Sequence, residues 1–223
     1  HLMMDIVLVG GGNQAHYIID IIHKEGKYNI IGIIDSIHDV GSSIFGYKII
    51  GRQENLKSLI DEYGIQGGII SIGDNWVRYN VSQQILQLIP DFTFINAIHP
   101  STIIGENVTL GRGIVAMAGT IFNPQAVLGD FTFFATGAQI EHDCIIEPYA
   151  SISAGSVLGG HVLVKRFAAL TLNVTVVDRV TIGENTVVGS SSLVTKSIGD
   201  NILVYGNPAK FIRTRNKNEK FLK

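Results

Sequence analysis

Two neighbouring side chains in the second half of the sequence have the types and spacing that acid–base chemistry needs. His142 and Asp143 are adjacent in the segment 140–144, which reads IEHDC. A free imidazole titrates near neutral pH and can accept a proton there, and a carboxylate beside it fixes the tautomer and supports the imidazolium. The pair therefore predicts a general base, His142, assisted by Asp143.

A second candidate cluster lies near the N-terminus, where an apolar run over residues 5–9 breaks into a glycine-rich turn. Gly10, Gly12 and Ala15 fit the pattern G-x-G-x-x-[G/A], and an acid, Asp35, ends the next apolar run twenty residues after Ala15. Such glycines admit a phosphate to a helix N-terminus, and the acid reads a ribose or base edge. The residues predicted to bind this nucleotide-linked substrate are Gly10, Gly11, Gly12, Asn13, Gln14, Asp35, Ser36, Gly73 and Asp74.

Structural alternatives stand beside these interpretations. The glycine turn can join a strand to a helix without any ligand, and Asp74 suits either the pocket or the N-cap of the following helix. Asp143 can pair with His161 instead of assisting a base. His99, before a proline, is expected to be structural, and Cys144 is expected to be a small buried thiol.

The elements that must hold the glycine turn alternate between strand and helix. Apolar runs at 5–9, 30–34, 47–50 and 67–72 alternate with helical patterns after Ala15, over 52–63 and through Arg78 to Leu88, and residues 92–95 are expected to close the unit with a further strand. This alternation predicts a small Rossmann-like parallel α/β domain over residues 4–95. The domain is too short for a full dinucleotide fold, so we expect it to hold one mononucleotide.

The elements that hold His142 follow from a six-residue period. From Ile98 to Val194 an apolar residue returns at every sixth position, seventeen times in all, with a small or β-branched residue four places after each. This period fits a solenoid of short strands with three hexads in each triangular coil. Residues eighteen apart then stack on adjacent coils at roughly 4.8 Å. Stacking places His142 between Pro124 and Gly160, and Asp143 between Gln125 and His161.

Glycines that follow the apolar anchors are expected at tight corners, where the absence of a Cβ costs least. They are Gly105, Gly111, Gly129, Gly159, Gly183 and Gly189.

With these motifs the chain resembles the hexapeptide-repeat acyltransferases, in the branch of sialic acid O-acetyltransferase-like and nucleotide-4-amino-sugar N-acetyltransferases, over nearly its whole length. The resemblance implies an all-β left-handed parallel β-helix over residues 96–200, after the α/β domain, and a C-terminal tail over 201–223. It also implies that His142 is the base and Asp143 the assisting acid. The run 206–210 resembles the family's closing signature near coenzyme A, which implies cofactor-binding roles for Gly206, Asn207, Pro208 and Lys210.

The sequence departs from the family pattern at two places. Asn13 and Gln14 stand where the family turn commonly has glycine and histidine, and Ala135-Thr136 replaces a usual Asn-Thr pair. The first departure leaves the phosphate-binding role of the turn intact. The second removes a possible hydrogen bond to the substrate and leaves the base untouched.

The resemblance implies an acetyl-CoA-dependent N-acetyltransferase acting on the 4-amino group of a UDP- or dTDP-linked 4-amino-4,6-dideoxy sugar. No serine or cysteine is placed as a nucleophile beside His142, so we expect direct attack, with a backbone N–H such as that of Gly155 holding the oxyanion. Sialic acid or other sugar O-acetylation is the alternative within the family. A γ-type carbonic anhydrase needs three converging histidines, and a non-catalytic sugar-nucleotide binder would transfer no acetyl group.

The composition limits the kinds of partner that the protein is expected to bind. A net charge of -2 gives no electrostatic case for nucleic acid or a membrane surface, and no apolar run has the length of a membrane span. We expect no signal peptide, no metal and a cytoplasmic location, and the resemblance implies a homotrimer with active sites between neighbouring prisms.

Overall fold

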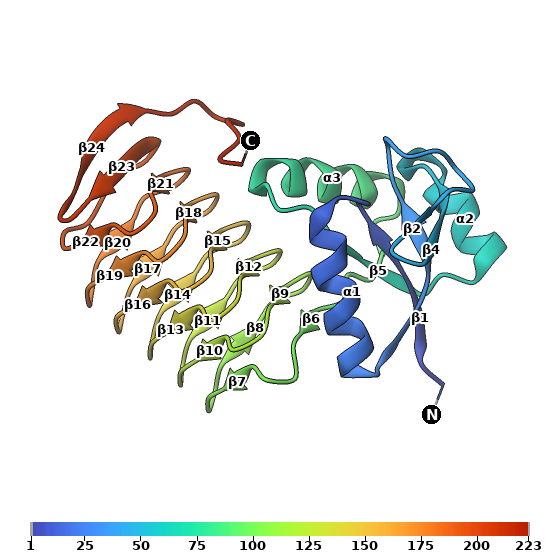
Figure 1. Cartoon of the computed structure of the whole chain (residues 1–223), viewed down its shortest axis with the longest axis horizontal. Coiled ribbons are helices and arrows are strands. Elements are labelled where there is room, and N and C mark those ends of the chain that lie inside the picture. Colours follow the sequence, from blue (N-terminus) through green and yellow to red (C-terminus); the bar gives the residue numbers. More distant parts are fainter. Residues whose placement is uncertain (1, 223) are drawn as a thin grey trace.

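The computed structural model describes residues 2–222 and places an α/β domain beside a long triangular prism (Figure 1). The domain has a five-stranded sheet in the order β3-β4-β2-β1-β5. Its strands are β1 (Met4–Val9), β2 (Tyr28–Ile34), β3 (Ser43–Ile44), β4 (Tyr47–Gly51) and β5 (Gly67–Ile70). All are parallel except β3, which pairs antiparallel with β4 at the sheet edge.

Three α-helices cover both faces of this sheet: α1 (Asn13–Glu25), α2 (Leu56–Tyr63), which follows the short 3₁₀ helix η1 (Gln53–Asn55), and α3 (Asn75–Leu88). Alternate residues of β1 point to opposite faces. Ile6 and Leu8 pack with α1, whereas Val7 and Val9 pack with α2 and α3. The α/β prediction is therefore confirmed. The strand expected over residues 92–95 is wrong, because only one isolated bridge, between Gly68 and Phe94, forms there.

The prism consists of two-residue strands, and from β6 to β19 each pairs in parallel with the strand three places later, at a register of eighteen residues. The predicted coil is thus confirmed. The strands are β6 (Ala97–Ile98), β7 (Ile103–Ile104), β8 (Thr109–Leu110), β9 (Val115–Ala116), β10 (Ile121–Phe122), β11 (Val127–Leu128), β12 (Phe133–Phe134), β13 (Gln139–Ile140), β14 (Ile145–Ile146), β15 (Ser151–Ile152), β16 (Val157–Leu158), β17 (Leu163–Val164), β18 (Ala169–Leu170), β19 (Thr175–Val176), β20 (Thr181–Ile182), β21 (Val187–Val188) and β22 (Leu193–Val194).

The second residue of each strand points inward, and a small residue four places on fills the remaining space. Ile140 and Ile146 are fully buried, as are the partners Cys144 and Ala150. The first coil is the exception: Ile98 and Leu110 are only partly buried and Ile104 is 45% exposed, because their strands begin the three sheets and have no preceding coil to cover them.

The corner glycines serve a different purpose from the one expected. The left-handed backbone positions of the corners are held by other residues, among them Gln125, Asp143 and His161. The glycine slot lies two places earlier, where the next coil approaches. A Cβ on Gly129 would lie 2.7 Å from the backbone nitrogen of Pro148, and one on Gly105 would lie 2.7 Å from that of Pro124. Close stacking of coils, and not backbone dihedral freedom, demands glycine there.

The division expected at residue 200 falls inside the last part of one prism sheet. Strand β23 (Ile202–Gly206) pairs in parallel with β21, and β24 (Ala209–Thr214) folds back antiparallel to β23. The irregular tail therefore begins at Arg215.

The α/β domain covers only one of the three prism sheets, the one that runs from β6 to β24. Outward side chains of that sheet, Val115 and Phe133, share a hydrophobic cluster with α1. The α3 helix docks through polar groups: Nδ2 of Asn75 donates to the carbonyl of Phe167 at 2.8 Å, and Arg78 is buried against the prism. Among residues 2–222, no helix is long and apolar enough to cross a bilayer.

Candidate active site

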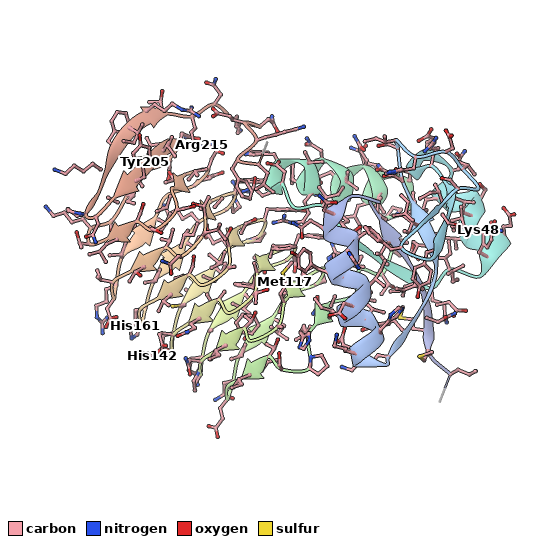
Figure 2. The ribbon with its side chains drawn as sticks, viewed as in Figure 1. Lys48, Met117, His142, His161, Tyr205 and Arg215 are labelled. Carbon is pink, nitrogen blue, oxygen red and sulfur yellow. The ribbon has the colours of Figure 1, made fainter. Side chains whose placement is uncertain are left out.

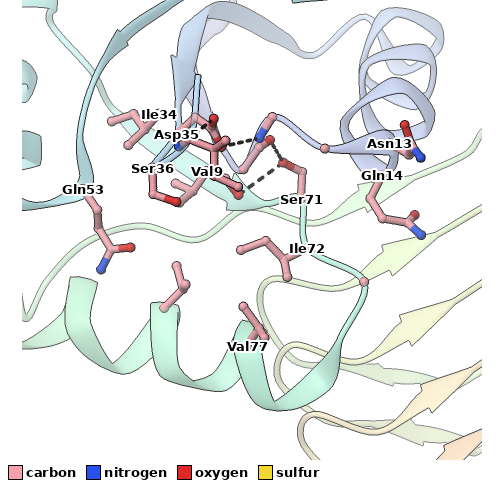
Figure 3. Close-up of a pocket in the computed structure, with 16 residues that line it drawn as sticks. Val9, Asn13, Gln14, Ile34, Asp35, Ser36, Gln53, Ser71, Ile72 and Val77 are labelled. Atoms are coloured by element: carbon pink, nitrogen blue, oxygen red, sulfur yellow. Dashed lines mark hydrogen bonds between the residues drawn. The ribbon is translucent and has the colours of Figure 1, made fainter. Parts of the chain in front are cut away.

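The glycine turn lines a cavity of about 360 Å³ at the carboxyl edge of β1 and β2 (Figure 3). Gly10 has φ +114°, and a Cβ there would lie 3.0 Å from the carbonyl oxygen of Ser71. Ser71 fixes the turn from the other side, since its hydroxyl donates to the carbonyls of Val9 and Gly10. Only glycine fits this conformation and this spacing.

The N-terminus of α1 opens onto the same cavity. Gly12 is its N-cap and no side chain caps it. The N–H of Ala15 donates to the carbonyl of Gly12 at 3.0 Å, whereas among residues 2–222 the N–H groups of Asn13 and Gln14 have no hydrogen-bond partner. A Cβ on Gly12 would meet nothing within 4 Å, which shows open space in front of the turn. Unpaired N–H groups and the positive end of the helix dipole suit a phosphate.

Asp35, directly after β2, holds the glycine turn by a hydrogen bond. Its Oδ1 accepts a hydrogen bond from the N–H of Gly11 at 3.1 Å, and its Oδ2 accepts from the N–H of His38 at 2.8 Å and lies 2.6 Å from that residue's Nδ1. Burial by itself would raise the pKa of Asp35, but these bonds and one from the N–H of Ile37 hold the pKa at about 2. Asp35 is therefore a carboxylate at neutral pH.

The structure brings most of the predicted nucleotide-site residues together. Asn13, Gln14, Ser36 and Gly73 line the cavity with the turn and Asp35. Asp74 does not line it: its Oδ1 accepts from the N–H groups of Trp76 and Val77, both at 3.1 Å, so it is the N-cap of α3.

Sequence reasoning missed Gln53 and two side chains of α3, Val77 and Val81, which also line the cavity. Gln53 follows β4, so it lies at the carboxyl edge of the parallel sheet, where ligands of such sheets bind. This position is the sequence signal that could have predicted Gln53 as a site residue. Figure 3 shows Gln53 at one end of the cavity and Gln14 at the other, toward the prism.

The predicted base lies at a prism corner, between β13 and β14. Nδ1 of His142 lies 2.8 Å from Oδ2 of Asp143, and Nε2 of His161 lies 3.7 Å from the same oxygen. The rings of His142 and His161 meet edge to face, 5.2 Å apart. All three side chains are partly exposed, so solvent and substrate can reach them.

Gly160, on the next coil, lies against the His142 ring, and its lack of a side chain leaves space for the ring. A Cβ on Gly160 would lie 2.5 Å from Nε2 of His142. With Nδ1 facing Asp143, Nε2 is the nitrogen left to take a proton from a substrate.

Other residues near the pair do not supply a nucleophile or an oxyanion donor. Cys144 is buried, and burial raises the pKa of its thiol to about 11, so it is a thiol at neutral pH. Gly155 lies at a different corner from His142, and its N–H already donates to the carbonyl of Thr136 at 3.0 Å. The structure therefore does not bring Gly155 together with the base.

Ligand-type atoms of His142, Asp143 and His161 lie within 4.8 Å of one another. Among residues 2–222 this is the group whose spacing could hold a divalent cation.

The residues expected to contact the cofactor lie at the far end of the prism. Pro208 and Lys210 line a cavity of about 490 Å³ together with Lys196, while Gly206 and Asn207 form the turn between β23 and β24. Lys196 comes fifty-four residues after His142, so it lies about three coils, or roughly 14 Å, farther along the prism. A long cofactor can reach from these lysines to the base.

The nucleotide cavity and the base lie on different sides of one chain. Figure 2 shows His142 and His161 at a prism edge away from the α/β domain, whose α1 adjoins Met117 on another sheet. The two sheets that meet at the His142 corner both expose apolar side chains: Val127 and Ile145 on the sheet from β8 to β20, and Ile103 on the sheet from β7 to β22.

A prism of hexads with an exposed imidazole–carboxylate pair, joined to a domain with a glycine-rich turn at a helix N-terminus, defines the class of hexapeptide-repeat acyltransferases. Comparisons with known proteins agree. Residues 5–85 match the family described as the PglD N-terminal domain. A structure of perosamine N-acetyltransferase from Caulobacter crescentus in complex with CoA and GDP-perosamine is 30% identical, with a TM-score of 0.88, over 95% of this chain and 98% of that one.

Two more distant matches are a solved structure and a sequence relative. The acetyltransferase domain of PglB from Neisseria gonorrhoeae, in complex with acetyl coenzyme A, is 24% identical over 95% of this chain and 100% of that one, with a TM-score of 0.85. An acyl-[acyl-carrier-protein]–UDP-N-acetylglucosamine O-acyltransferase from Ectopseudomonas mendocina is 28% identical over 48% of this chain. The matched region spans 42% of that relative's own length. The chain belongs to the family of nucleotide amino-sugar acetyltransferases with a hexapeptide-repeat, left-handed β-helix fold.

Proposed function

We propose that this protein transfers the acetyl group of acetyl-CoA to the amino group of a nucleoside-diphosphate-linked amino sugar, with His142 as general base. The single observation that carries the proposal is the pairing of Nδ1 of His142 with Asp143, which leaves Nε2 free over Gly160. A family relative that binds CoA and GDP-perosamine supports the choice of cofactor and acceptor class.

The amine nitrogen attacks the thioester carbon, and its proton passes to Nε2 of His142. A bond from nitrogen to carbon forms as the carbon–sulfur bond breaks, and the departing thiolate takes the proton back from the imidazolium. Asp143 accepts from Nδ1–H throughout and stabilises the charged ring. Since the thiol of Cys144 is buried and protonated, no covalent acyl-enzyme is required.

The acceptor would lie along the nucleotide cavity. Its base and ribose suit the end near Asp35, Ser36 and Gln53, and its diphosphate suits the uncapped N-terminus of α1. The sugar would then extend past Gln14, which also lines a smaller cavity of about 230 Å³ between α1 and the prism.

A second copy of the chain would complete the site. An acceptor on the α/β domain of one copy cannot meet the histidine at the opposite edge of the same prism, but it can meet that of a neighbour. The apolar side chains on the two uncovered sheets suit such an association, and the predicted homotrimer would place acetyl-CoA between two prisms.

The test is CoA thiol release from acetyl-CoA with UDP-, dTDP- and GDP-linked 4-amino-4,6-dideoxy sugars. The UDP and dTDP sugars are the acceptors predicted from the sequence, and the GDP sugar follows from the relative. We expect turnover with one nucleotide at least tenfold above the others, and an N-acetyl product by mass spectrometry. An O-acetylated product, or no product with any of the three, contradicts the proposal.

A further inference from the structure

The last residues described, 215–222, do not trail into solvent but return to the α/β domain. Figure 1 shows the C-terminus beside the start of α3, far from the end of the prism that the segment leaves. We call residues 215–222 the strap. Its first residue, Arg215, anchors it to the prism, and its last residues, Phe221 and Leu222, contact the α/β domain near the nucleotide cavity.

The anchor is a buried guanidinium. Nε of Arg215 donates to the carbonyl of Asn185 at 3.1 Å, and Nη2 donates to the carbonyl of Glu219 at 2.7 Å. Nδ2 of Asn185 in turn donates to the carbonyl of Asn216 at 3.0 Å, and its Oδ1 accepts from Nε1 of Trp76 at 2.9 Å. One asparagine therefore ties the strap and α3 together.

Glu219 closes the loop of the strap. Its Oε1 accepts from Nη2 of Arg213 at 2.6 Å and its Oε2 accepts from the N–H of Asn216 at 2.9 Å. The hydrogen bond from Arg213 is the main reason that the pKa of Glu219 is lowered to about 2. The strap is thus held in one conformation by groups that stay charged over the physiological pH range.

The end of the strap lies at the acceptor side. The N–H of Phe221 donates to Oδ2 of Asp74 at 3.0 Å, the oxygen that the α3 cap leaves free. A Cβ on Gly73 would lie 2.9 Å from Cδ1 of Leu222 and 3.1 Å from Nε2 of Gln14, so these three residues meet between the two cavities. Phe221 and Leu222 both line the cavity of about 230 Å³.

That smaller cavity is mostly apolar. Met117, Phe133 and Ala135 line it together with the two strap residues, and its polar lining residues are Gln14, Tyr17, Thr136, Ser151 and Ser153. An apolar wall favours a methyl group over a hydroxymethyl group, because the added hydroxyl would lose its hydrogen bonds to water.

From these contacts we infer that Phe221 and Leu222 of the strap form the wall that contacts C6 of the acceptor sugar and selects a 6-deoxy sugar over its 6-hydroxy counterpart. The inference rests on the proposed function, since it concerns the acceptor of that reaction. It assigns sugar selectivity to a segment outside both the nucleotide turn and the hexad prism.

The test compares Leu222→Ala with Leu88→Ala, a matched control whose side chain is exposed to the same degree at the other end of α3. The acceptors are GDP-perosamine, dTDP-4-amino-4,6-dideoxyglucose and the 6-hydroxy counterpart of the latter, dTDP-4-amino-4-deoxyglucose. For the 6-deoxy acceptor that the wild type uses, we expect Leu222→Ala to raise KM about tenfold and to reduce the preference over the 6-hydroxy sugar. KM for acetyl-CoA and Kd for the free nucleoside diphosphate should stay within about twofold of wild type, because Phe221 and Leu222 line neither the nucleotide cavity nor the cavity at Lys196 and Lys210.

A second variant, Asp74→Ser, keeps a residue that caps α3 but removes the oxygen that holds Phe221. We expect faster tryptic cleavage at Lys217 and Lys220 together with the same rise in KM. A wild type that acetylates a 6-deoxy acceptor, with Leu222→Ala unchanged in KM and in preference, overturns the inference alone. A wild type that acetylates none of the three sugars overturns the proposed function and this inference with it.

Discussion

The side chains of His142 and Asp143 face each other although the residues are neighbours in sequence, with 2.8 Å between Nδ1 and Oδ2. The corner makes this possible. Asp143 has φ +59°, a left-handed conformation that aspartate tolerates better than most residues. The turn brings the carboxylate back onto the preceding imidazole, and His161 on the next coil approaches the same oxygen from the other side.

This geometry predicts unequal effects for the two partners of Asp143. Asp143→Asn should lower kcat about tenfold or more with little change in KM, because an amide no longer stabilises the imidazolium. His161→Asn should change kcat by less than about threefold, since its contact at 3.7 Å is weak. Steady-state kinetics of both variants decide between them. A larger loss in His161→Asn would mean that Asp143 serves His161 first.

Removing the base itself should be far more severe. His142→Ala should lower turnover by about 100-fold or more, as expected for loss of a general base, with unchanged binding of CoA by calorimetry. His23→Ala, on α1, is the matched histidine control and should retain full activity. Retention of more than about a tenth of the wild-type rate in His142→Ala would remove this residue from the chemistry.

Asp35 predicts the behaviour of the nucleotide cavity. Asp35→Asn weakens the bonds to the N–H groups of Gly11 and His38, so the turn should loosen and Kd for the preferred free nucleotide should rise about tenfold. Because the pKa of Asp35 is about 2, its carboxylate should cause no change in wild-type affinity between pH 5 and pH 8. Calorimetry at both pH values measures this, with Asp39→Asn as a control in the same loop.

The hydrogen bonds of the Arg78 guanidinium join the α/β domain to the prism, so their loss should lower stability. Its Nε donates to the carbonyl of Phe131 at 2.8 Å, Nη1 to that of Gly73 at 3.0 Å and Nη2 to Oγ of Ser151 at 3.0 Å. Burial lowers its pKa to about 10, so it remains charged at neutral pH. Arg78→Met leaves these acceptors unpaired and should lower the free energy of unfolding by about 3 kcal/mol, measured with urea. Arg179→Met, at an exposed corner, should change it by less than about 0.5 kcal/mol.

Glu25 gives the fold a pH dependence. Burial raises the pKa of this carboxyl to about 6, so the folded state favours the protonated form. Its contribution to stability is complete below the unfolded pKa of 4.5 and is lost as pH rises through 6. The free energy of unfolding of Glu25→Gln should therefore match that of the wild type at pH 4.5 and exceed it by about 1 kcal/mol at pH 7.5, after allowance for solvent screening, with a higher Tm at pH 7.5. Equal Tm values at pH 7.5 would contradict this, and the exposed Glu62→Gln serves as control.

The sequence alone determined the two kinds of domain and the place of the base. A period of six, held over seventeen repeats, leaves one register for the coils, because a slip of one residue would turn every apolar anchor outward. That register by itself predicts His142 beside Gly160 and Asp143 beside His161. The glycine turn and Asp35 were equally readable, since glycine and a strand-end acid have a strong local meaning.

Only the tertiary structure decided the roles that depend on distant segments. Asp74 caps a helix and also holds the strap. The N–H of Gly155 donates to the carbonyl of Thr136. The corner glycines are needed because the backbone of the next coil lies too close for a Cβ. The strap reaches Asp74 from 147 residues away in the chain. Local patterns carry no information about such contacts, because which surfaces meet is set by the packing of whole domains and not by the spacing of neighbouring residues.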